Sequence, residues 1–311
     1  MLTSSRARAH GWPLAGPAAN VEAEPVSADL PLRETPRRMA TRWILGIAYA
    51  LQPQRIASVP HLLIWTFLDL VRGGTEVPDQ NRTRSRPDTF AGVVRNLTPE
   101  TYLKALRAGF FAWAHCGPLK WWTRDKRMVL FFENAHVSRR LTRQIRSGKY
   151  TFTFDTAFDR VLHHCGAPRS YNWHTLTWLT PRYMQFFSRL HRMGHAHSFE
   201  VWNADGVLVG GGFGLAVGRV FVGESMFSLE SDTSKLACAV LYPHLEKWGY
   251  AMVDARDYTP VLEKSGYQQI PRAKFEALMA EHAQGAAPSD AWVVDPALLQ
   301  ETYGPIANGA A

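Results

Sequence analysis

The chain has 311 residues, of which 46% are apolar and 20% charged, so it can bury a full hydrophobic core and is not a largely disordered protein. Its net charge is +8, and nine Lys or Arg lie between Lys120 and Lys149 with only two acids among them. This local excess suggests either a phosphate-bearing partner or a solvated helix face.

Targeting and redox signals point to the cytoplasm. No apolar run reaches the roughly eighteen residues that a membrane helix needs, and the first residues hold no continuous apolar stretch of the kind found in a secretory signal. The three cysteines form no CxxC pair, which excludes a disulfide framework and favours a reducing compartment.

Residues 1–90 are expected to form an N-terminal extension. Residues 1–40 are rich in Pro, Ala, Ser and Arg without periodicity, which predicts a largely disordered segment. The apolar stretches 43–51 and 61–72 predict helices, and residues 73–90 are expected to be a polar linker.

Residues 91–125 are expected to form a small N-terminal domain. Thr98, Pro99 and Glu100 predict a helix start, because a hydroxyl N-cap, a proline at the first helical position and an acid in the first turn occur together. The tryptophan-rich stretch 113–122 is expected to be a loop.

Residues 126–280 are expected to form the larger domain, and residues 281–311 a tail rich in Gly, Ala and Pro. Alternation and helical spacing predict, in chain order, a strand at 127–132, a basic helix at 138–149, a strand at 150–158, helices at 159–165 and 181–194, an antiparallel meander at 197–227, a helix at 234–249, a buried strand at 250–256 and a helix at 272–284. Such an order predicts an α+β domain built on a mixed α/β sheet.

Packing alone does not explain four segments, namely WWTRDKR with HVSRRLTRQIR, GHAHSFEVW, VGESMFSLESDTSK and MVDARD. In the first, aromatic rings alternate with guanidinium groups, which suits base stacking and phosphate neutralisation. Asp254 ends an apolar strand, where a carboxylate has to be hydrogen-bonded, paired or functional. His195 and His197 have the spacing of metal ligands, but without a second His/Cys cluster a hydrogen-bonding role is favoured.

Together these segments resemble the leucyl/phenylalanyl-tRNA–protein transferases in order and spacing, over roughly Leu97 to Phe275. The most specific part is GHAHSFEVW followed by GESMFS, and the N-terminal extension marks a divergent member. The resemblance implies a GNAT-like acyltransferase domain preceded by a small N-terminal domain. It also implies a monomer that moves an amino acid from aminoacyl-tRNA to the N-terminal amine of an acceptor protein or peptide, without metal, acetyl-CoA or other cofactor. The product would mark the acceptor for degradation.

The resemblance also implies the catalytic residues. Asp254 and Glu224 match the two acidic site residues of the family, Asp254 to hold or relay the amine proton and Glu224 to orient the acceptor backbone. Arg256 stands where the family has glutamine, and a guanidinium there would stabilise an oxyanion or a terminal phosphate.

The resemblance also implies the residues that bind the substrates. Trp113 and Trp178 are expected beside the terminal adenosine and the acceptor peptide, with Ser225 and Ser228 as hydrogen-bonding support. The pocket for the donor side chain is expected to contain Phe221, Met226, Val253, Leu241, Leu245 and Gly212. The two leucines replace family phenylalanines and Gly212 replaces a methionine, which enlarges or reshapes the pocket.

The expected tRNA surface combines the basic segment with its tryptophans, namely Trp121, Trp122, Arg124, Lys126, Arg127, Arg139, Arg140, Arg143 and Arg146. An aminoacyl-tRNA-dependent transferase is therefore the leading hypothesis. Transfer to a small-molecule or other amine is a second, a non-catalytic tRNA-binding protein a third, and a CoA-dependent acyltransferase a fourth.

Overall fold

The structure is a computed structural model that describes residues 34–53, 55–80, 83, 89–113, 117–167, 177–289 and 291–307. The prediction of disorder for residues 1–33 therefore lies outside the described residues. For residues 36–40 it is wrong, because helix α1 (Pro36–Ala50) already begins there, with Thr35 as its N-cap and Pro36 in its first turn. The 3₁₀ turn η1 (Ile56–Ser58) and helix α2 (Val59–Val71) follow, so both helices expected in this region are present.

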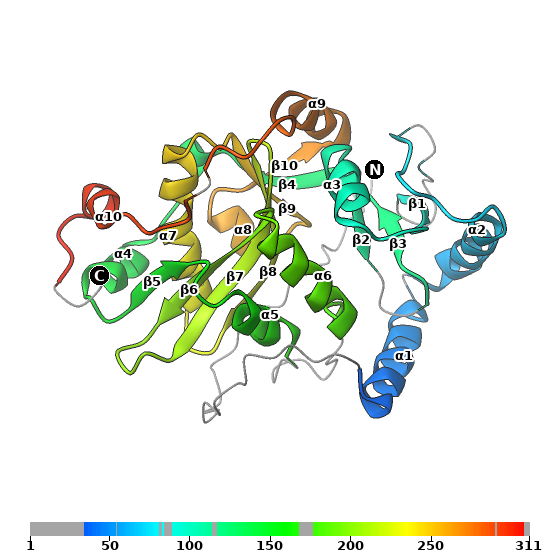
Figure 1. The fold of residues 1–311 in the computed structure, drawn as a ribbon, viewed down its shortest axis with the longest axis horizontal. Helices are drawn as coiled ribbons and strands as arrows, with labels where there is room; N and C mark the ends of the chain where they lie inside the picture. Colours follow the sequence, from blue (N-terminus) through cyan, green and yellow to red (C-terminus); the bar gives the residue numbers. More distant parts are fainter. Residues whose placement is uncertain are drawn as a thin grey trace, which may run out of the picture.

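A three-stranded antiparallel sheet follows, with strand order β1 (Phe90–Val93), β3 (Lys120–Trp122) and β2 (Phe111–Trp113). The loop predicted over the tryptophan-rich stretch is thus wrong at its two ends, which pair as β2 and β3. The first two residues of each of these strands are buried, and Trp121 is fully buried. Helix α3 (Pro99–Arg107) packs beside this sheet and begins with a capping box formed by Thr98 and Thr101, which confirms the predicted helix start (Figure 1).

The main sheet has seven strands in the order β10-β4-β9-β8-β7-β6-β5. Their bounds are β4 (Lys126–Leu130), β5 (Thr151–Phe154), β6 (Ala196–Trp202), β7 (Leu208–Val217), β8 (Val220–Ser228), β9 (Met252–Arg256) and β10 (Gln268–Pro271). All neighbours are antiparallel except β8 and β9, which are parallel and are connected through helix α7 (Thr233–Lys247). This arrangement confirms the predicted α+β class and the predicted meander.

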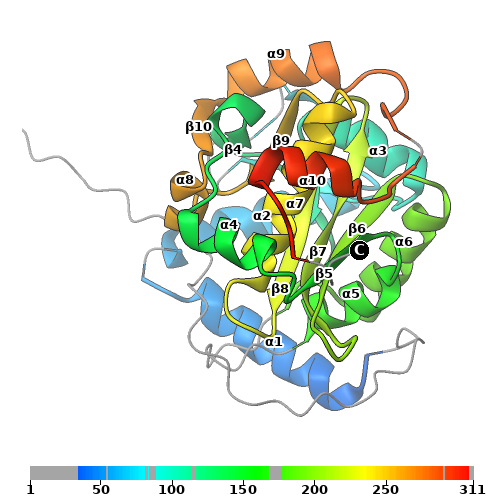
Figure 2. The ribbon, with the colours of Figure 1, turned by 90° about the vertical axis from the view of Figure 1, so that its left-hand side faces the viewer.

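Helices cover both faces of this sheet (Figures 1 and 2). One face holds α3, α5 (Phe158–Gly166) and α6 (Pro181–Arg192), and the other holds α4 (Arg139–Arg146), α7 and α10 (Pro296–Tyr303). The remaining short elements are η3 (Phe132–Asn134), α8 (Pro260–Lys264) and α9 (Arg272–His282).

The C-terminal segment is more ordered than its composition predicts. Trp292, Leu299 and Tyr303 are buried in the core under α7, and Asp295 caps α10 through hydrogen bonds to two backbone N–H groups. Within the described residues, no helix combines the length and apolar character that crossing a bilayer requires.

Candidate active site

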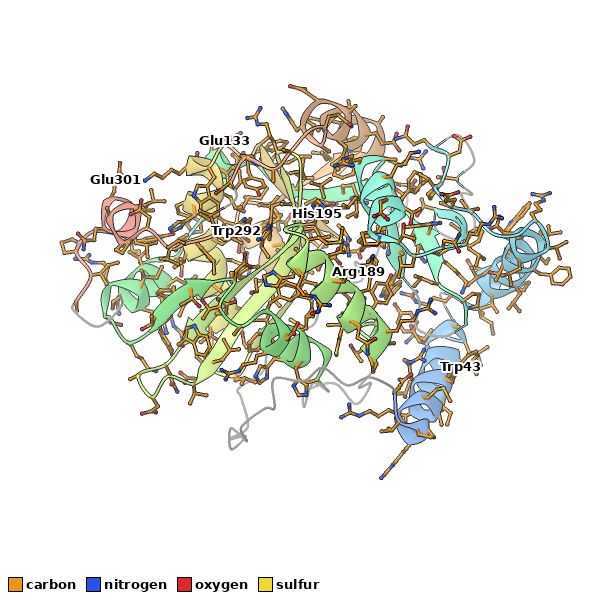
Figure 3. The ribbon with its side chains drawn as sticks, in the orientation of Figure 1. Trp43, Glu133, Arg189, His195, Trp292 and Glu301 are labelled. Carbon is orange, nitrogen blue, oxygen red and sulfur yellow. The ribbon has the colours of Figure 1, made fainter. Side chains whose placement is uncertain are left out.

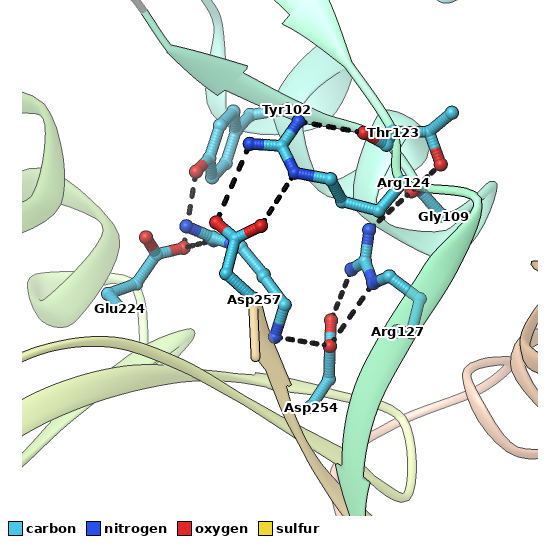
Figure 4. Close-up of polar contacts among 9 residues, drawn as sticks. Tyr102, Gly109, Thr123, Arg124, Arg127, Glu224, Asp254 and Asp257 are labelled. Atoms are coloured by element: carbon cyan, nitrogen blue, oxygen red, sulfur yellow. Dashed lines mark hydrogen bonds and ion pairs between the residues drawn. The ribbon is translucent and has the colours of Figure 1, made fainter. Parts of the chain in front are cut away.

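Glu224 and Asp254 lie on the adjacent parallel strands β8 and β9, and both are buried. A β-bulge places each of them. On β8, Gly223 and Ser225 pair with consecutive residues of β7, so Glu224 is the extra residue, and on β9 the extra residue is Ala255. Both carboxylates lie on the same sheet face as Val222 and Met252 and point toward the small sheet and α3 (Figure 4).

Asp254 is fully occupied by hydrogen bonds. Its two carboxylate oxygens accept from the guanidinium of Arg127, with Nε to Oδ1 at 3.2 Å, and Oδ1 also accepts from the backbone N–H of Arg256 at 2.9 Å. The remaining terminal nitrogen of Arg127 donates to the Gly109 carbonyl at 3.0 Å. Because both side chains are only 1% exposed, this ion pair is a structural link between β4, β9 and the turn after α3.

Glu224 has one occupied and one open oxygen. Its Oε1 accepts from the Arg256 guanidinium and from the Tyr102 hydroxyl, the latter at 3.2 Å. Its Oε2 is buried without a hydrogen-bond partner in the described part of the chain. Burial raises the pKa of Glu224, and the neighbouring Arg256 cation opposes this without cancelling it. The open oxygen is therefore suited to accept a proton or bind an ammonium group.

Arg256 has a backbone φ of +63°, a left-handed conformation that costs a non-glycine residue about 1 kcal/mol or more. In this conformation its N–H bonds Asp254 while its side chain reaches Glu224 on the next strand. Burial is the largest single effect and acts to lower the pKa of Arg256, but Glu224, Tyr102 and Asp254 together outweigh it and raise the pKa, so the guanidinium stays charged. The side chain is 12% exposed, which leaves it accessible to a ligand.

Three arginines surround the ring of Phe111, and each is paired with its own acid. The guanidinium carbons of Arg124, Arg127 and Arg256 lie 4.9, 5.6 and 5.0 Å from the ring centroid. Arg124 bonds Asp257 at 2.6 Å, as Arg127 bonds Asp254 and Arg256 bonds Glu224. The centre is thus charge-balanced, and an incoming ion has to displace or join an existing pair.

An aromatic wall forms one side of this centre. Tyr102 packs edge-on against Phe186 and Phe187 of α6 at centroid distances of 5.2 and 6.0 Å. Tyr183 donates to the Ala112 carbonyl at 2.8 Å and lies edge-on to Trp178 at 5.5 Å. Trp113 is half-buried, and its carbonyl accepts from Trp122 Nε1 at 2.9 Å. Trp178 thus belongs to the aromatic wall through Tyr183 and Phe187, and Trp113 adjoins it through Ala112, whose carbonyl bonds Tyr183.

The residues expected around the donor side chain gather in one cluster on the α7 face of the sheet. Phe221, Val253, Leu241 and Leu245 are at most 3% exposed there. Met226 packs against the same cluster, and the Cys238 thiol lies 3.2 Å from its sulfur.

The backbone around Gly212 leaves no room for a side chain. A Cβ on Gly212 would lie 2.7 Å from both Met226 and Phe199 and 2.6 Å from the Ser225 carbonyl. Met226, Phe199 and the Ser225 carbonyl therefore occupy the space beside Gly212, and the pocket is not enlarged at this point. Ser225 is buried close by. Ser228 instead exchanges hydrogen bonds with Ser234 at the start of α7, at 2.8 and 3.0 Å.

The basic segment does not form one continuous surface. Trp121 is fully buried and its Nε1 donates to the Thr75 carbonyl, and Arg127 is paired inside the site, so neither presents a face to RNA as expected. Both strands are covered on their two faces, so consecutive side chains are buried, Lys120 and Trp121 on β3 and Arg127 to Leu130 on β4. Lys126 is exposed, Trp122 is half-buried and Arg124 is paired with Asp257.

Helix α4 carries the exposed part of the basic segment. Arg139, Arg140, Arg143 and Arg146 lie on the side opposite Leu141 and Ile145, which are buried. Arg140 also pairs with Asp232 at 3.1 Å, and Arg146 reaches the Pro305 carbonyl at 3.4 Å. Figure 1 shows α4 and β3 near opposite ends of the molecule.

Three residues of the centre were absent from the sequence-based prediction, namely Tyr102, Phe111 and Asp257. Only Asp257 carried a sequence signal, since it stands three residues after Asp254. His197 forms a hydrogen bond with Asp155 at 2.7 Å and stacks on Trp292 at 3.9 Å, in line with the hydrogen-bonding role. Among the described residues, no three His, Cys, Asp or Glu side chains gather as metal ligands would.

Comparison with known proteins gives a consistent result. A family model described as leucyl/phenylalanyl-tRNA protein transferase matches residues 129–280. A protein named leucyl/phenylalanyl-tRNA–protein transferase from Stutzerimonas stutzeri is 41% identical over 230 residues, which cover 74% of this chain and 99% of that protein. Proteins of the same name from Pseudomonas syringae pv. tomato and Azotobacter vinelandii are 41% and 38% identical, and the matches cover 69% and 72% of this chain and 91% and 98% of theirs.

We expect Asp254→Ala to lower the free energy of unfolding by about 3 kcal/mol or more, because it leaves the Arg127 cation buried and unpaired. Urea denaturation measures this change. The double variant Arg127→Met/Asp254→Ala should lose less than the sum of the single variants. Asp257→Ala is the matched control, and it should cost about 1 kcal/mol or less because its pair with Arg124 is partly exposed. Equal losses for Asp254→Ala and Asp257→Ala would contradict the structural role of the buried pair.

Proposed function

This chain belongs to the leucyl/phenylalanyl-tRNA–protein transferase family, and we propose that it moves a leucine- or phenylalanine-like amino acid from aminoacyl-tRNA to the N-terminal amine of an acceptor protein or peptide. The product would mark the acceptor for degradation, and the use of charged tRNA points to the cytoplasm. The open Oε2 of buried Glu224, beside the cationic Arg256, is the observation that carries this proposal.

Attack of an amine on an aminoacyl ester has three requirements. The amine must lose a proton, the developing oxyanion must be stabilised, and the leaving ribose oxygen must gain a proton. The ester is already activated, so positioning supplies much of the acceleration and the proposed reaction needs no metal or acetyl-CoA.

We assign the first requirement to Glu224. Its Oε2 has no hydrogen-bond partner in the described part of the chain, and burial raises the pKa of this carboxyl, which makes it a stronger base than an exposed glutamate. Asp254 has both oxygens engaged by Arg127 and Arg256, so taking a proton would break a buried ion pair. This proposal exchanges the roles that the sequence suggested, because Asp254 becomes the residue that positions the two arginines.

Arg256 is placed to serve the second requirement. It is charged, and it contacts Glu224 directly. Binding of the acceptor ammonium at Glu224 would neutralise that carboxylate and release the guanidinium toward the oxyanion of the attacked ester. The proton taken by Glu224 is then available for the ribose oxygen.

The two substrates approach from different sides in this proposal. The aromatic wall of Trp113, Trp178 and Tyr183 offers faces for the terminal adenosine and the acceptor peptide. The apolar cluster under α7 receives the donor side chain, and the arginines of α4 contact tRNA phosphates.

The test is transfer of radiolabelled leucine or phenylalanine from charged tRNA to peptides that begin with Arg or Lys. We expect the purified chain to label such peptides. The variant Glu224→Gln should lower kcat by about 100-fold or more, because it removes the proton acceptor while keeping the side-chain volume.

Ser228→Ala is the control, since Ser228 bonds Ser234 at the start of α7 and should leave kcat within about twofold. Labelling of a small amine but of no peptide would favour the other acceptor class. Binding of charged tRNA without any transfer would favour a non-catalytic protein, and a Glu224→Gln variant with full activity would exclude Glu224 as the base.

Arg256→Gln, which restores the residue of the family, should move the acid limb of the kcat/KM pH profile to higher pH. Arg256 lowers the pKa of Glu224, so removing its cation raises that pKa further. The base works only when ionised, and activity is therefore lost at a higher pH as the solution is acidified. Arg124→Gln is the control, because its cation pairs with Asp257 instead. An acid limb that stays in place or moves to lower pH would contradict the assignment.

Charge reversal on α4 tests the tRNA surface. Arg139→Glu/Arg143→Glu should weaken tRNA binding and reduce the slope of log K against log salt by on the order of 2, since two phosphate contacts are lost. Fluorescence anisotropy at several salt concentrations measures both quantities. Arg189→Glu/Arg192→Glu on α6 makes the same charge change at exposed positions, and it should leave the slope unchanged. An equal loss in both double variants would mean that α4 is not the contact surface.

A further inference from the structure

Helix α1 exposes a stripe of apolar side chains. Met39, Trp43, Ile44, Ile47 and Leu51 are between 44% and 67% exposed. Their spacing places all five on one side of the helix, or at its end. Figure 3 shows Trp43 on the outer side of α1. An amphipathic helix normally turns such a stripe toward the core, so this one is directed to something outside the described chain.

Helix α2 shows the same feature. Leu63, Ile64, Phe67, Leu70 and Val71 are between 50% and 71% exposed and also lie on one side of their helix. Single exposed apolar residues are ordinary on protein surfaces, but a stripe of five on each of two successive helices is a binding surface.

The opposite side of α2 fixes its orientation. Thr66 is buried, and the Asp69 carboxylate accepts from the backbone N–H of Val93 in β1 at 2.6 Å and from the Thr75 hydroxyl at 3.1 Å. These contacts hold α2 against the small sheet by its polar side, so the apolar stripe faces outward as part of the folded arrangement.

Within residues 34–72 the exposed charges are all of one sign. Arg37, Arg38 and Arg72 are exposed there, whereas the two acids are engaged, Glu34 with Arg42 at 2.8 Å and Asp69 with β1. The exposed acids Glu76 and Asp79 follow beyond α2. Two copies of such a surface would bring arginines face to face, which disfavours self-association. A partner that is both apolar and anionic fits it.

From these observations we propose that α1 and α2 bind the surface of an anionic phospholipid bilayer. The helices have 15 and 13 residues, too short for the roughly 20 that span a bilayer. They lie in the interface, with the apolar stripes among the acyl chains, Trp43 at the headgroup level and Arg37, which flanks the α1 stripe, on anionic phosphates. The two helices lie at the outer edge of the molecule (Figure 1).

The experiment uses the full chain and vesicle flotation. We expect binding to vesicles of 70% phosphatidylcholine and 30% phosphatidylglycerol, at least tenfold weaker binding to phosphatidylcholine alone, and release as salt is raised. Equal binding to both vesicle types, or none to the anionic ones, would overturn the proposal.

Variants locate the binding surface. Ile44→Asp/Phe67→Asp should reduce anionic-vesicle binding at least tenfold while peptide transfer and Tm stay as in the wild type, because both side chains are exposed. Met193→Asp/Val293→Asp makes the same charge change at exposed apolar positions outside the extension and should bind vesicles normally. Equal loss in both variants would refute the assignment of the surface. So would a concentration-dependent dimer that Ile44→Asp/Phe67→Asp abolishes without any vesicle binding.

Discussion

The buried ion pair between Arg127 and Asp254 is the interaction on which the site depends. A cation and an anion removed from water are stable only as a pair with their other hydrogen-bonding groups satisfied, and here the Gly109 carbonyl and the Arg256 N–H satisfy them. The pair therefore joins three elements that are distant in sequence: the turn after α3, strand β4 and strand β9. These three elements hold the backbone of Arg256 in place, and its guanidinium bonds Glu224 on the neighbouring strand β8.

Local geometry then separates the two acids chemically. Both are buried carboxylates on neighbouring strands, but the bulge at Glu224 leaves one oxygen open while the bulge next to Asp254 brings the Arg256 N–H onto its carboxylate. The two carboxylates therefore differ chemically. Asp254 has both oxygens hydrogen-bonded, whereas Glu224 is desolvated and has one oxygen without a partner in the described residues.

The sequence predicted six strands of the main sheet, β4 to β9, and the helix start at Thr98, since each depends on local periodicity or capping chemistry. It failed where long-range pairing decides. Trp121 and Arg127 belong to a segment with the composition of an RNA surface, but both are buried because other elements cover the two faces of β3 and β4. Helix α10 was not predicted, although Asp295 followed by Pro296 is a helix-start pattern, because the segment around it is rich in Gly, Ala and Pro. The bulges left no trace in the sequence, because an unpaired residue is defined only by its partner strand.

Helix α7 limits which substitutions the fold can accept near the site. It is the crossover between β8 and β9, and its inner side carries Leu241 and Leu245 above the strands that bear Glu224 and Asp254. A bulkier residue on the inner side of α7 would push the helix away from the sheet and shift β8 and β9. A substitution that changes which donor amino acid fits would therefore also displace Glu224 and Asp254. Changes in such a cluster should proceed by compensated exchanges of volume, because the space beside Gly212 is already filled by Met226 and Phe199.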